Sequence, residues 1–384
     1  RFVGGGTQGD GWLDPTAALI ARYMLPRDPV SSYVWRSVAG DDYRRTLPTS
    51  AWLDLALFAS DWAGNTAVPA TLEGAGLPLM AHYARRGKLI ARSDWSPEAL
   101  ALHFDARPDA FATASDSVDR GTFALYALGR AWAIHAEARQ ARQSGDYNVV
   151  HIDGRAQAWK APSVRFVKHQ DAGAIAFGVA DLKYAYDWQW SPAWPGKGDA
   201  FAAPWEPENS DPRLLGWPDD PAWLPRKLFD EPGLGPAGIY LRRRSFNPVQ
   251  KAFRMALLAR RARPYVVIVD DVRKDDQVHA YSWHLQLPPD LELESNEERD
   301  VVLRDPRDGR RLLVRVLEAD GYVGTQLESY QAPLAADPKQ SLPGRRLIIL
   351  ADTIEPRFKV LLDPHMTGEA LPRIDGPLTM DRAV

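Results

Sequence analysis

The sequence predicts a mainly β fold, in which a large antiparallel β-sandwich follows a short α-helical segment. From residue 86 onward, short runs of alternating apolar and polar residues lie between turn residues, as expected for half-buried strands. Few helical patterns separate these runs, which favours an antiparallel sandwich over a parallel α/β sheet. No internal repeat of roughly 20–50 residues occurs, so solenoid and propeller folds are disfavoured.

The α-helical segment is predicted over residues 1–85. Pro15 stands where the first residue of a helix is expected, and Thr49 or Ser50 can cap the run Ala51–Phe58, which is rich in helix formers and contains no Gly or Pro. The chain begins at Arg1 without an initiator Met, so we expect that part of the protein lies upstream.

The β-sandwich is predicted over residues 86–384. Alternation is clear at 100–104 and 147–152, and similar runs follow at 121–134, 174–186, 237–246, 264–271, 279–287, 311–318, 346–352 and 358–362. Val249–Arg263 would also suit a helix by composition, but strands surround it and we assign it to a strand. His103 lies on the more polar face of its strand, which predicts exposure to solvent.

Composition excludes several classes of protein. The 384 residues carry 47 Lys+Arg against 50 Asp+Glu, a net charge of −3, and no cysteine. Disulfide-stapled and cysteine-ligated metal folds are therefore excluded. The balanced charge gives no reason to expect nucleic acid or a membrane surface as partner, and no apolar run approaches the roughly 18–20 residues that span a bilayer. Aromatic residues are abundant, with 14 Trp and 13 Tyr.

A long irregular stretch at about 187–236 contains six of the Trp residues among many prolines. We expect an ordered flap on the sandwich, because six Trp argue against disorder. Pyranose rings present apolar C–H faces that pack on indole, so the predicted substrate-binding residues are Trp188, Trp190, Trp194 and Lys197. Alternatively, the loop uses its Trp residues as a small core of its own.

Two apparent signatures do not meet their structural requirements. The glycines of Gly4–Gly11 follow no strand and precede no Gly-Lys-Ser/Thr, so a phosphate loop is not supported. The sequence has neither a Gly-x-Ser-x-Gly elbow nor a His-Glu-x-x-His helix, which leaves serine hydrolases and zincins without a local signature.

Six short sequence motifs in the predicted sandwich occur in a characteristic order. They are Arg92–Trp95, Asp119–Leu125, Gly129–Ile134, Asp146–Gly154, Arg260–Asp271 and Trp283–Leu287. In this order and at these distances they resemble the carboxy-terminal β-sandwich of the heparinase II/III-like polysaccharide lyases, which include alginate and related uronic-acid lyases. In that family an (α/α) toroid precedes the sandwich, and the segment 1–85 resembles its last turns.

The resemblance implies β-elimination at a uronic acid, with a Tyr or His base and donors that stabilise the enolate-like charge. In the family the principal His and Tyr come from the toroid, most of which we expect to lie upstream of this chain. The sandwich usually adds a His-x-His-x-Asp-x-Gly-Ser-Phe strand. The matching stretch here is Ser115–Phe123, in which Ser115 and Ser117 replace both histidines.

The same comparison bears on metals. The other ligand positions of the family correspond here to His135 and roughly Tyr147. One His and one Tyr make a poor zinc site, since zinc normally takes four N, S or O ligands. We therefore predict no metal at this position and no cofactor.

The predicted catalytic residues are Tyr147, His135, Arg120 and Asn148. Tyr147 is the candidate acid/base with Asn148 as a carboxylate donor, although Tyr147 also reads as a half-buried strand aromatic. His135 either acts in the site or is a structural histidine at a strand end. Arg120 either pairs with a substrate carboxylate or forms a salt bridge within the protein.

Three functions remain open at this stage. The first is a polysaccharide lyase, periplasmic or secreted, whose partner is an acidic polysaccharide or oligosaccharide. The second is a non-catalytic carbohydrate-binding module, which the serines at 115 and 117 would suit. The third is a glycoside hydrolase that uses two carboxylates, for example Asp116 with Asp119 or Asp187.

Overall fold

The computed structural model describes residues 76–107, 119–134, 147–158, 164–193, 240–333, 339 and 341–369. The chain divides into one unit of residues 1–79 and 94–99 and a second of 80–93 and 100–384. In the described part of the first unit, the indole N–H of Trp95 donates to the carbonyl of Leu77 at 3.2 Å. The second unit consists almost entirely of antiparallel strands, which confirms the predicted mainly β sandwich.

A five-stranded sheet begins this second unit. Its strands pair in sequence order: β1 (Met80–Tyr83), β2 (Lys88–Arg92), β3 (Ala101–Asp105), β4 (Phe123–Ala127) and β5 (Arg130–Ala133). The short 3-10 helix η3 (Ala84–Arg86) joins β1 to β2 and ends at Gly87, whose φ of 57° lies in the left-handed region that glycine adopts easily.

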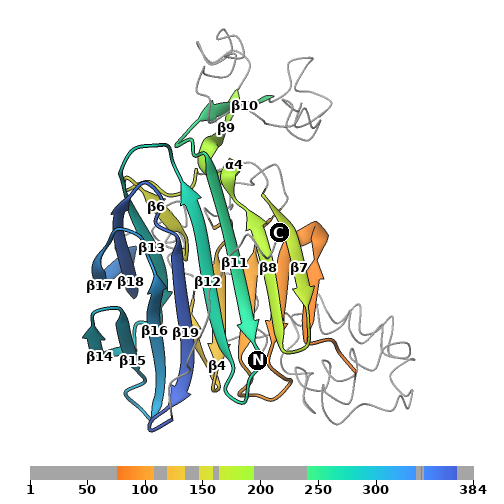
Figure 1. Ribbon diagram of the computed structural model, residues 1–384, viewed down its shortest axis with the longest axis vertical. Coiled ribbons are helices and arrows are strands. Elements are labelled where there is room, and N and C mark those ends of the chain that lie inside the picture. The colour runs from red at the N-terminus through yellow and green to blue at the C-terminus, as the bar shows by residue number, and fades with distance from the viewer. Residues whose placement is uncertain are drawn as a thin grey trace. The chain divides into compact units, whose positions relative to one another are not determined.

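The largest sheet has eight strands, which lie side by side in Figure 1. In spatial order they are β14 (Glu292–Glu297), β15 (Asp300–Arg304), β16 (Arg310–Glu318), β19 (Phe358–Met366), β12 (Tyr265–Arg273), β11 (Lys251–Ala259), β8 (Ile175–Asp181) and β7 (Arg165–Asp171). The strand β11 confirms the assignment of Val249–Arg263 to strand rather than helix.

Two smaller sheets complete the described fold. The four-stranded sheet has the order β17 (Tyr322–Pro333), β18 (Ser341–Thr353), β13 (His279–Leu287) and β6 (Val150–Ile152). The helix α4 (Lys183–Asp187) leads into β9 (Trp188–Ala193), which pairs with β10 (Tyr240–Ser245). The predicted flap of 187–236 therefore starts as a strand, and its residues 194–236 lie outside the described residues.

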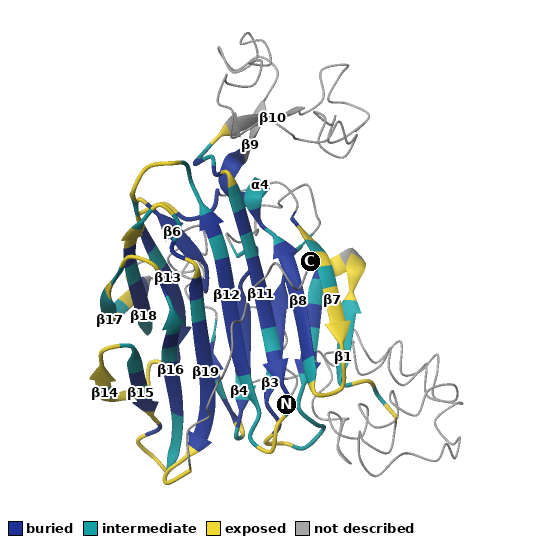
Figure 2. Cartoon of the chain, in the orientation of Figure 1, coloured by how far each residue is buried: buried dark blue, intermediate teal, exposed yellow. Residues whose placement is uncertain are grey.

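The main core lies between the sheets, and Figure 2 shows the buried strands of the eight-stranded sheet in dark blue. In β13, Tyr281, Trp283 and Leu285 point into this core, as strand alternation requires. The backbone N–H of Ile134 donates to the carbonyl of Gln286 at 3.0 Å, which joins the end of β5 to the four-stranded sheet. The five-stranded and four-stranded sheets are thus hydrogen-bonded to each other in one layer of the sandwich.

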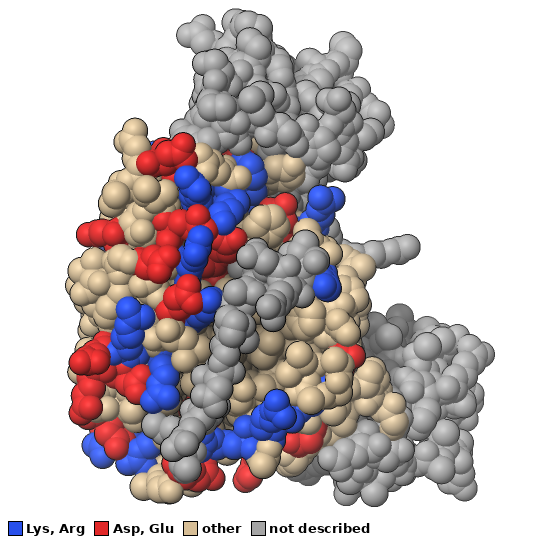
Figure 3. Space-filling model, in the orientation of Figure 1, with Lys and Arg blue, Asp and Glu red and all other residues tan. Residues whose placement is uncertain are grey.

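The eight-stranded sheet is apolar on both faces near its centre. In β12, Val266 and Ile268 belong to the main core, whereas Val267 and Val269 belong to a second buried cluster on the opposite face. A strand buried on both faces reads as a continuous apolar run, and the sequence Tyr265–Val269 has that form. Figure 3 shows basic and acidic side chains interspersed around this face, with no large area of one sign.

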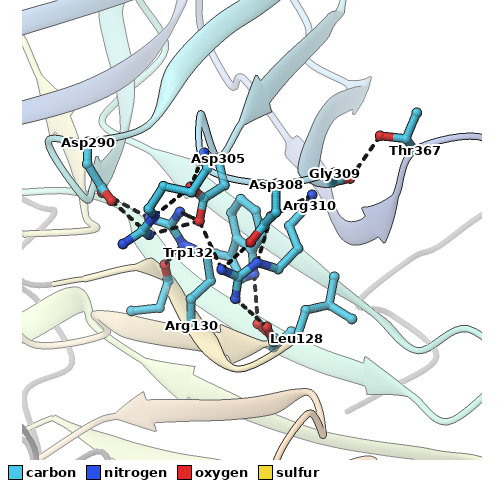
Figure 4. A network of polar contacts seen from close by, with 12 residues as sticks. Leu128, Arg130, Trp132, Asp290, Asp305, Asp308, Gly309, Arg310 and Thr367 are labelled. Carbon is cyan, nitrogen blue, oxygen red and sulfur yellow. Dashed lines mark hydrogen bonds and ion pairs between the residues drawn. The ribbon is translucent and has the colours of Figure 1, made fainter.

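A polar network fastens the β4–β5 turn to the β15–β16 turn (Figure 4). Arg130 forms ion pairs with Asp305 and with Asp290, the latter at 2.9 Å. Arg310 donates to the carbonyl of Leu128 at 2.8 Å and to Asp305 at 3.2 Å. Arginine hydrogen bonds outweigh burial and hold the pKa of Asp305 below its usual value. The five-stranded and eight-stranded sheets are therefore joined at their turns as well as through the core.

Several strands were not predicted from the sequence. Residues 80–83 of the predicted helical segment form β1, so the helical prediction is wrong there; residues 1–75 lie outside the described residues. The polar strands β7 and β14 are mostly exposed, and an exposed strand carries no apolar alternation to detect. The other unpredicted strands are β2, β9, β15 and β17.

Candidate functional site

Strand β3 and the segment Asp119–Thr122 run side by side and bring two carboxylates together. The N–H of Asp105 donates to the carbonyl of Thr122 at 3.0 Å, and the N–H of Gly121 donates to the carbonyl of Asp105 at 2.7 Å. Gly121 has a φ of 83°, which allows the tight turn between Asp119 and β4. Asp119 thereby lies beside Asp105, which ends β3.

Two basic side chains accompany these carboxylates. The guanidinium of Arg107 lies 2.5 Å from Asp119 through Nη2 and 3.7 Å from Asp105 through Nε. Lys88 lies opposite Asp105 in the β2–β3 register, and its Nζ is 3.4 Å from Oδ2 of Asp105. We refer to Lys88, Asp105, Arg107 and Asp119 as the Asp105 cluster.

The environment of Asp105 favours its protonated form. Only 6% of this residue is exposed. Burial, together with the negative charge of Asp119, raises the pKa of Asp105 to about 7, although Arg107 and Lys88 act in the opposite direction. A carboxyl whose pKa lies near neutrality can donate or accept a proton under physiological conditions, which is the property required of a general acid or base.

A buried ion pair holds the backbone next to this cluster. Arg254 on β11 and Asp270 on β12 form two hydrogen bonds of 2.7 and 2.9 Å. Arg254 also donates to the carbonyls of Gly121, at 2.7 Å, and Asn148. Trp283 donates from its indole to Asp270 at 2.9 Å. The eight-stranded sheet therefore fixes the two loops that carry Arg120, Tyr147 and Asn148.

Asn148 acts within the protein in this arrangement. Its amide Nδ2 donates to the carbonyls of Phe123, at 2.6 Å, and Ile134, at 3.1 Å, while its Oδ1 accepts from the N–H of Gln286 at 2.6 Å. The side chain is fully buried. The amide thus joins three chain segments, and the carboxylate contact predicted from the sequence has no donor available in this conformation.

The other predicted catalytic residues have different outcomes. Arg120 is fully buried, so a substrate carboxylate does not reach it in this conformation; its carbonyl accepts from Gln157 at 2.5 Å. Tyr147 is 4% exposed and packs with Val149 and Ala156, which matches the structural reading of this residue. The structure brings Arg120, Tyr147 and Asn148 to neighbouring loops, whereas His135 lies outside the described residues.

The predicted sugar-binding residues are only partly described. Trp188 is 3% exposed, so its indole belongs to the interior and offers no open face to a pyranose. For Trp190 the structure gives the backbone, in β9 opposite Arg243, and not the side chain. Trp194 and Lys197 lie outside the described residues, and their predicted sugar contacts remain predictions.

The carboxylates named for glycoside hydrolysis are only partly described, and those that are described have different partners. Asp119 belongs to the Asp105 cluster, and Asp116 lies outside the described residues. Asp187 is fully buried at the end of α4, where it pairs with Lys183 and accepts from the N–H of Val249 at 2.9 Å. Its contacts indicate that Asp187 holds the turn after α4.

In the described residues, no group of three or more His, Cys, Asp or Glu side chains is arranged to hold a metal ion. Within the same ranges, no helix has both the length and the apolar character needed to cross a membrane.

Sequence reasoning missed Asp105 as a site residue and was wrong about His103. The polar face predicted for His103 is buried: His103 is 8% exposed, and Asp105, at the end of the same strand, is 6% exposed. The reason is that β3 is the central strand of its sheet, with β2 and β4 on either side. The detectable signal was an Asp at a strand end followed two residues later by Arg107.

Comparisons with known proteins give a fold-level result. No protein-family model and no curated protein matches the sequence. Among solved structures, heparan sulfate lyase HepC from Pedobacter heparinus matches with a TM-score of 0.53 and 13% identity over 95% of this chain and 54% of that chain. A mutant of HepC matches with a TM-score of 0.52 and 14% identity, over 91% of this chain and 43% of that one.

A third structure, described as a heparinase III gene product, has a TM-score of 0.51 and 13% identity over 90% of this chain and 42% of that chain. At such identity the similarity shows the fold alone. The fold-level part of the resemblance noted in the sequence is therefore confirmed. This chain spans about half the length of the structures that it matches.

Proposed function

We propose that the protein is a polysaccharide lyase that cleaves a uronic-acid-containing glycan by β-elimination, in the periplasm or outside the cell. The observation that carries the proposal is the fold similarity of 90–95% of this chain to heparinase III and heparan sulfate lyase structures. The ordered sequence motifs that resemble those of heparinase II/III-like lyases support this proposal independently of the coordinates.

The proposed reaction needs a base, an acid and a means of neutralising the uronate carboxylate. The base removes the proton from C5, the C4–C5 double bond forms, and the C4–O bond breaks while the leaving oxygen takes a proton from the acid. We assign the acid role to Asp105, because its pKa of about 7 leaves a large fraction of this carboxyl protonated near neutral pH. His135 is our candidate base, and Arg120, Tyr147 and Asn148 position the loops.

A glycoside hydrolase is the second candidate, and one observation favours it. Asp105 and Asp119 form a carboxyl pair in which burial raises the pKa of Asp105 while Arg107 contacts Asp119 directly. Two carboxyl groups in different environments are the arrangement that acid–base hydrolysis of a glycoside requires. A non-catalytic carbohydrate-binding protein is the third reading, because Ser115 and Ser117 replace the histidines of the lyase motif.

The full-length protein, including any upstream region of its reading frame, tests these candidates directly. It is incubated with heparan sulfate, alginate and hyaluronan, and the ultraviolet absorbance of the unsaturated uronate is followed. A rise in absorbance supports the lyase, and new reducing ends without it select the hydrolase. Binding without either product selects the non-catalytic protein.

Variants then test the roles of individual residues. Asp105→Asn removes the proton that the acid would donate and should lower kcat by roughly 100-fold or more. Asp276→Asn is the matched control, because Asp276 is exposed and pairs with Arg273 at a different turn. Equal activity of the Asp105→Asn variant and the parent protein would remove Asp105 from the mechanism.

A further inference from the structure

The strands β1, β2 and β3 align three polar side chains in one row. The register places Tyr83 of β1 opposite Lys88 of β2, and Lys88 opposite Asp105 of β3. Residues that face each other in an antiparallel pair project to the same face of the sheet. Leu89 and Phe104, which neighbour this row in sequence, lie in the main core, so the row lies on the outer face of the five-stranded sheet. We call Tyr83, Lys88 and Asp105 the outer row.

The outer row becomes more accessible toward the edge of the sheet. Asp105 is buried on the central strand, the side chain of Lys88 is 29% exposed, and Tyr83 on the edge strand β1 is 53% exposed. Tyr83 and Asp105 are two strand spacings apart, or about 10 Å. The outer row therefore presents an aromatic ring and an ammonium group at the surface, with a carboxyl group at its inner end.

Lys88 depends on Asp105 for its counter-charge, whereas the other basic residue of the Asp105 cluster does not. Arg107 has Asp119 as an ion-pair partner at 2.5 Å. The Nζ of Lys88 lies 3.4 Å from Oδ2 of Asp105, and among the described residues Asp105 is the carboxylate that pairs with it. When Asp105 holds a proton, Lys88 therefore loses its counter-charge. A partly exposed ammonium group in that state attracts an external anion.

The surroundings of Asp105 favour this protonated state near neutral pH. The charged groups that face it are Lys88 from β2, Arg107 from the segment after β3 and Asp119 from the loop before β4. His103 lies two residues earlier on the same face of β3. Burial and the charge of Asp119 raise the pKa of Asp105 to about 7, and its Oδ1 is buried without a hydrogen bond. A substantial fraction of the protein thus has a neutral Asp105 at neutral pH.

We propose that Lys88 binds the carboxylate of an acidic sugar, while the ring of a neighbouring sugar in the same chain packs on Tyr83. A uronate-containing glycan carries both carboxylates and apolar C–H faces, so one chain matches both exposed members of the row. The inference rests on the proposed function, in which a group must neutralise the uronate carboxylate and Asp105 protonates the leaving oxygen. Lys88 takes the first role, for which Arg120 and Asn148 are too deeply buried.

Binding at Lys88 and protonation of Asp105 are coupled. A sugar carboxylate on Lys88 lies beside Asp105 and disfavours the ionised form of that carboxyl group. By the same coupling, an ionised Asp105 pairs with Lys88 and repels the sugar carboxylate. The bound substrate thereby preserves the proton that the leaving oxygen needs. Affinity for an acidic sugar should therefore fall as pH rises through the pKa of about 7.

The test measures binding by calorimetry with the full-length protein. The probes are decasaccharides of heparan sulfate, alginate and hyaluronan, each in native and in carboxyl-reduced form. Lys88→Met should weaken binding of at least one native probe roughly tenfold or more, and leave binding of its carboxyl-reduced form unchanged. Lys88→Arg keeps the charge and should retain most of the affinity. Tyr83→Ala should weaken both forms about three- to tenfold, because a stacked ring needs no carboxylate.

A lysine on another sheet is the matched control. Lys359 is also partly buried and pairs with one carboxylate, that of Glu318, on the eight-stranded sheet. Lys359→Met should leave the affinity for every probe unchanged. Thermal unfolding of each variant verifies that it is folded.

The pH dependence of binding tests the coupling without removing Lys88. The amide of Asp105→Asn stays neutral, so Lys88 lacks its counter-charge at every pH. The affinity of this variant for the native probe should stay nearly constant between about pH 6 and 8, where the affinity of the parent falls. Parallel pH profiles of parent and variant would contradict the pairing of Lys88 with the sugar carboxylate.

Product analysis separates this inference from the lyase proposal. A loss of affinity in Lys88→Met that is confined to native probes supports the outer row even if the parent forms no unsaturated product. Unchanged affinity of folded Lys88→Met, or an equal loss for native and carboxyl-reduced probes, overturns the outer row, and unsaturated product from the parent still supports the lyase. Failure of the parent to bind any probe overturns the inference and counts against the lyase.

Discussion

Arg254 and Asp270 face each other across β11 and β12 and form a two-pronged ion pair in which each side chain is 1% exposed. The pair does more than join neighbouring strands. Arg254 also donates to the carbonyls of Gly121 and Asn148, and Asp270 accepts a hydrogen bond from the indole N–H of Trp283. One ion pair therefore links both layers of the sandwich to the loops of the candidate site.

Replacement of Arg254 should be strongly destabilising. Arg254→Met leaves the Asp270 carboxylate buried without its cation, which costs about 3–5 kcal/mol in the free energy of unfolding. The double replacement Arg254→Met with Asp270→Leu removes the stranded charge and should recover part of this loss. Recovery stays incomplete, because the carbonyls of Gly121 and Asn148 still lack a donor. Urea denaturation measures all three values.

An exposed pair of the same chemistry is the control for this prediction. Arg304 donates to Glu292 through Nε at 3.1 Å and Nη2 at 2.7 Å, with side-chain exposures of 51% and 48%. Arg304→Met should change the unfolding free energy by about 0–1 kcal/mol, since water replaces the lost contact. Similar losses for the two arginine variants would contradict the importance assigned to burial.

Local patterns predicted the strands of the core well and the polar edges poorly. The predicted strands 264–271 and 279–287 correspond to Tyr265–Arg273 and His279–Leu287, because apolar alternation there reflects direct burial. The run 121–134 is two strands, since Leu128 and Gly129 adopt positive φ and turn the chain. Such a turn has little effect on apolar periodicity, so the sequence did not reveal it.

The candidate site was harder to predict than the fold. Tyr147 and Asn148 were predicted from a short sequence motif. The motif does not reveal that the Asn148 side chain forms hydrogen bonds with three backbone groups. Asp105 and Asp119 are brought together by hydrogen bonds between β3 and the loop before β4. A pairing of this kind depends on long-range register, which a single sequence does not specify.

Gly87 should resist replacement more strongly than other glycines of similar backbone conformation. Its φ is 57°, and a Cβ there would lie 2.1 Å from the carbonyl oxygen of Ala106. Gly87→Ala therefore combines left-handed strain with a backbone clash and should cost roughly 3 kcal/mol or more. Gly173→Ala, at a φ of 76° with no atom within 4 Å, carries the strain alone and should cost about 1–2 kcal/mol. Equal losses in urea denaturation would show that the clash is relieved.

The raised pKa of Asp105 should be visible in the pH dependence of stability. Its ordinary value of 3.8 rises to about 7 in the folded protein. As pH increases from about 4 to 7, the unfolded chain releases this proton while the folded protein retains it, so stability falls across that window. Asp105→Asn has no such proton, so its free energy of unfolding should fall less steeply with pH than that of the parent. The difference in unfolding free energy, variant minus parent, should therefore be roughly 2–4 kcal/mol more positive at pH 8 than at pH 4.

Asp171 provides a contrast of opposite sign. Two hydrogen bonds from Arg260, at 2.5 and 3.0 Å, outweigh burial and lower the pKa of Asp171. Its stabilisation is present above the unfolded value of 3.8 and is lost as pH falls through the lower folded value. Asp171→Asn should therefore be less stable than the parent at pH 7, with the difference shrinking below pH 4. Thermal unfolding between pH 3 and 8 measures the stability of both variants and the parent. Parallel curves of stability against pH for Asp105→Asn and the parent would refute the protonated state assigned to Asp105.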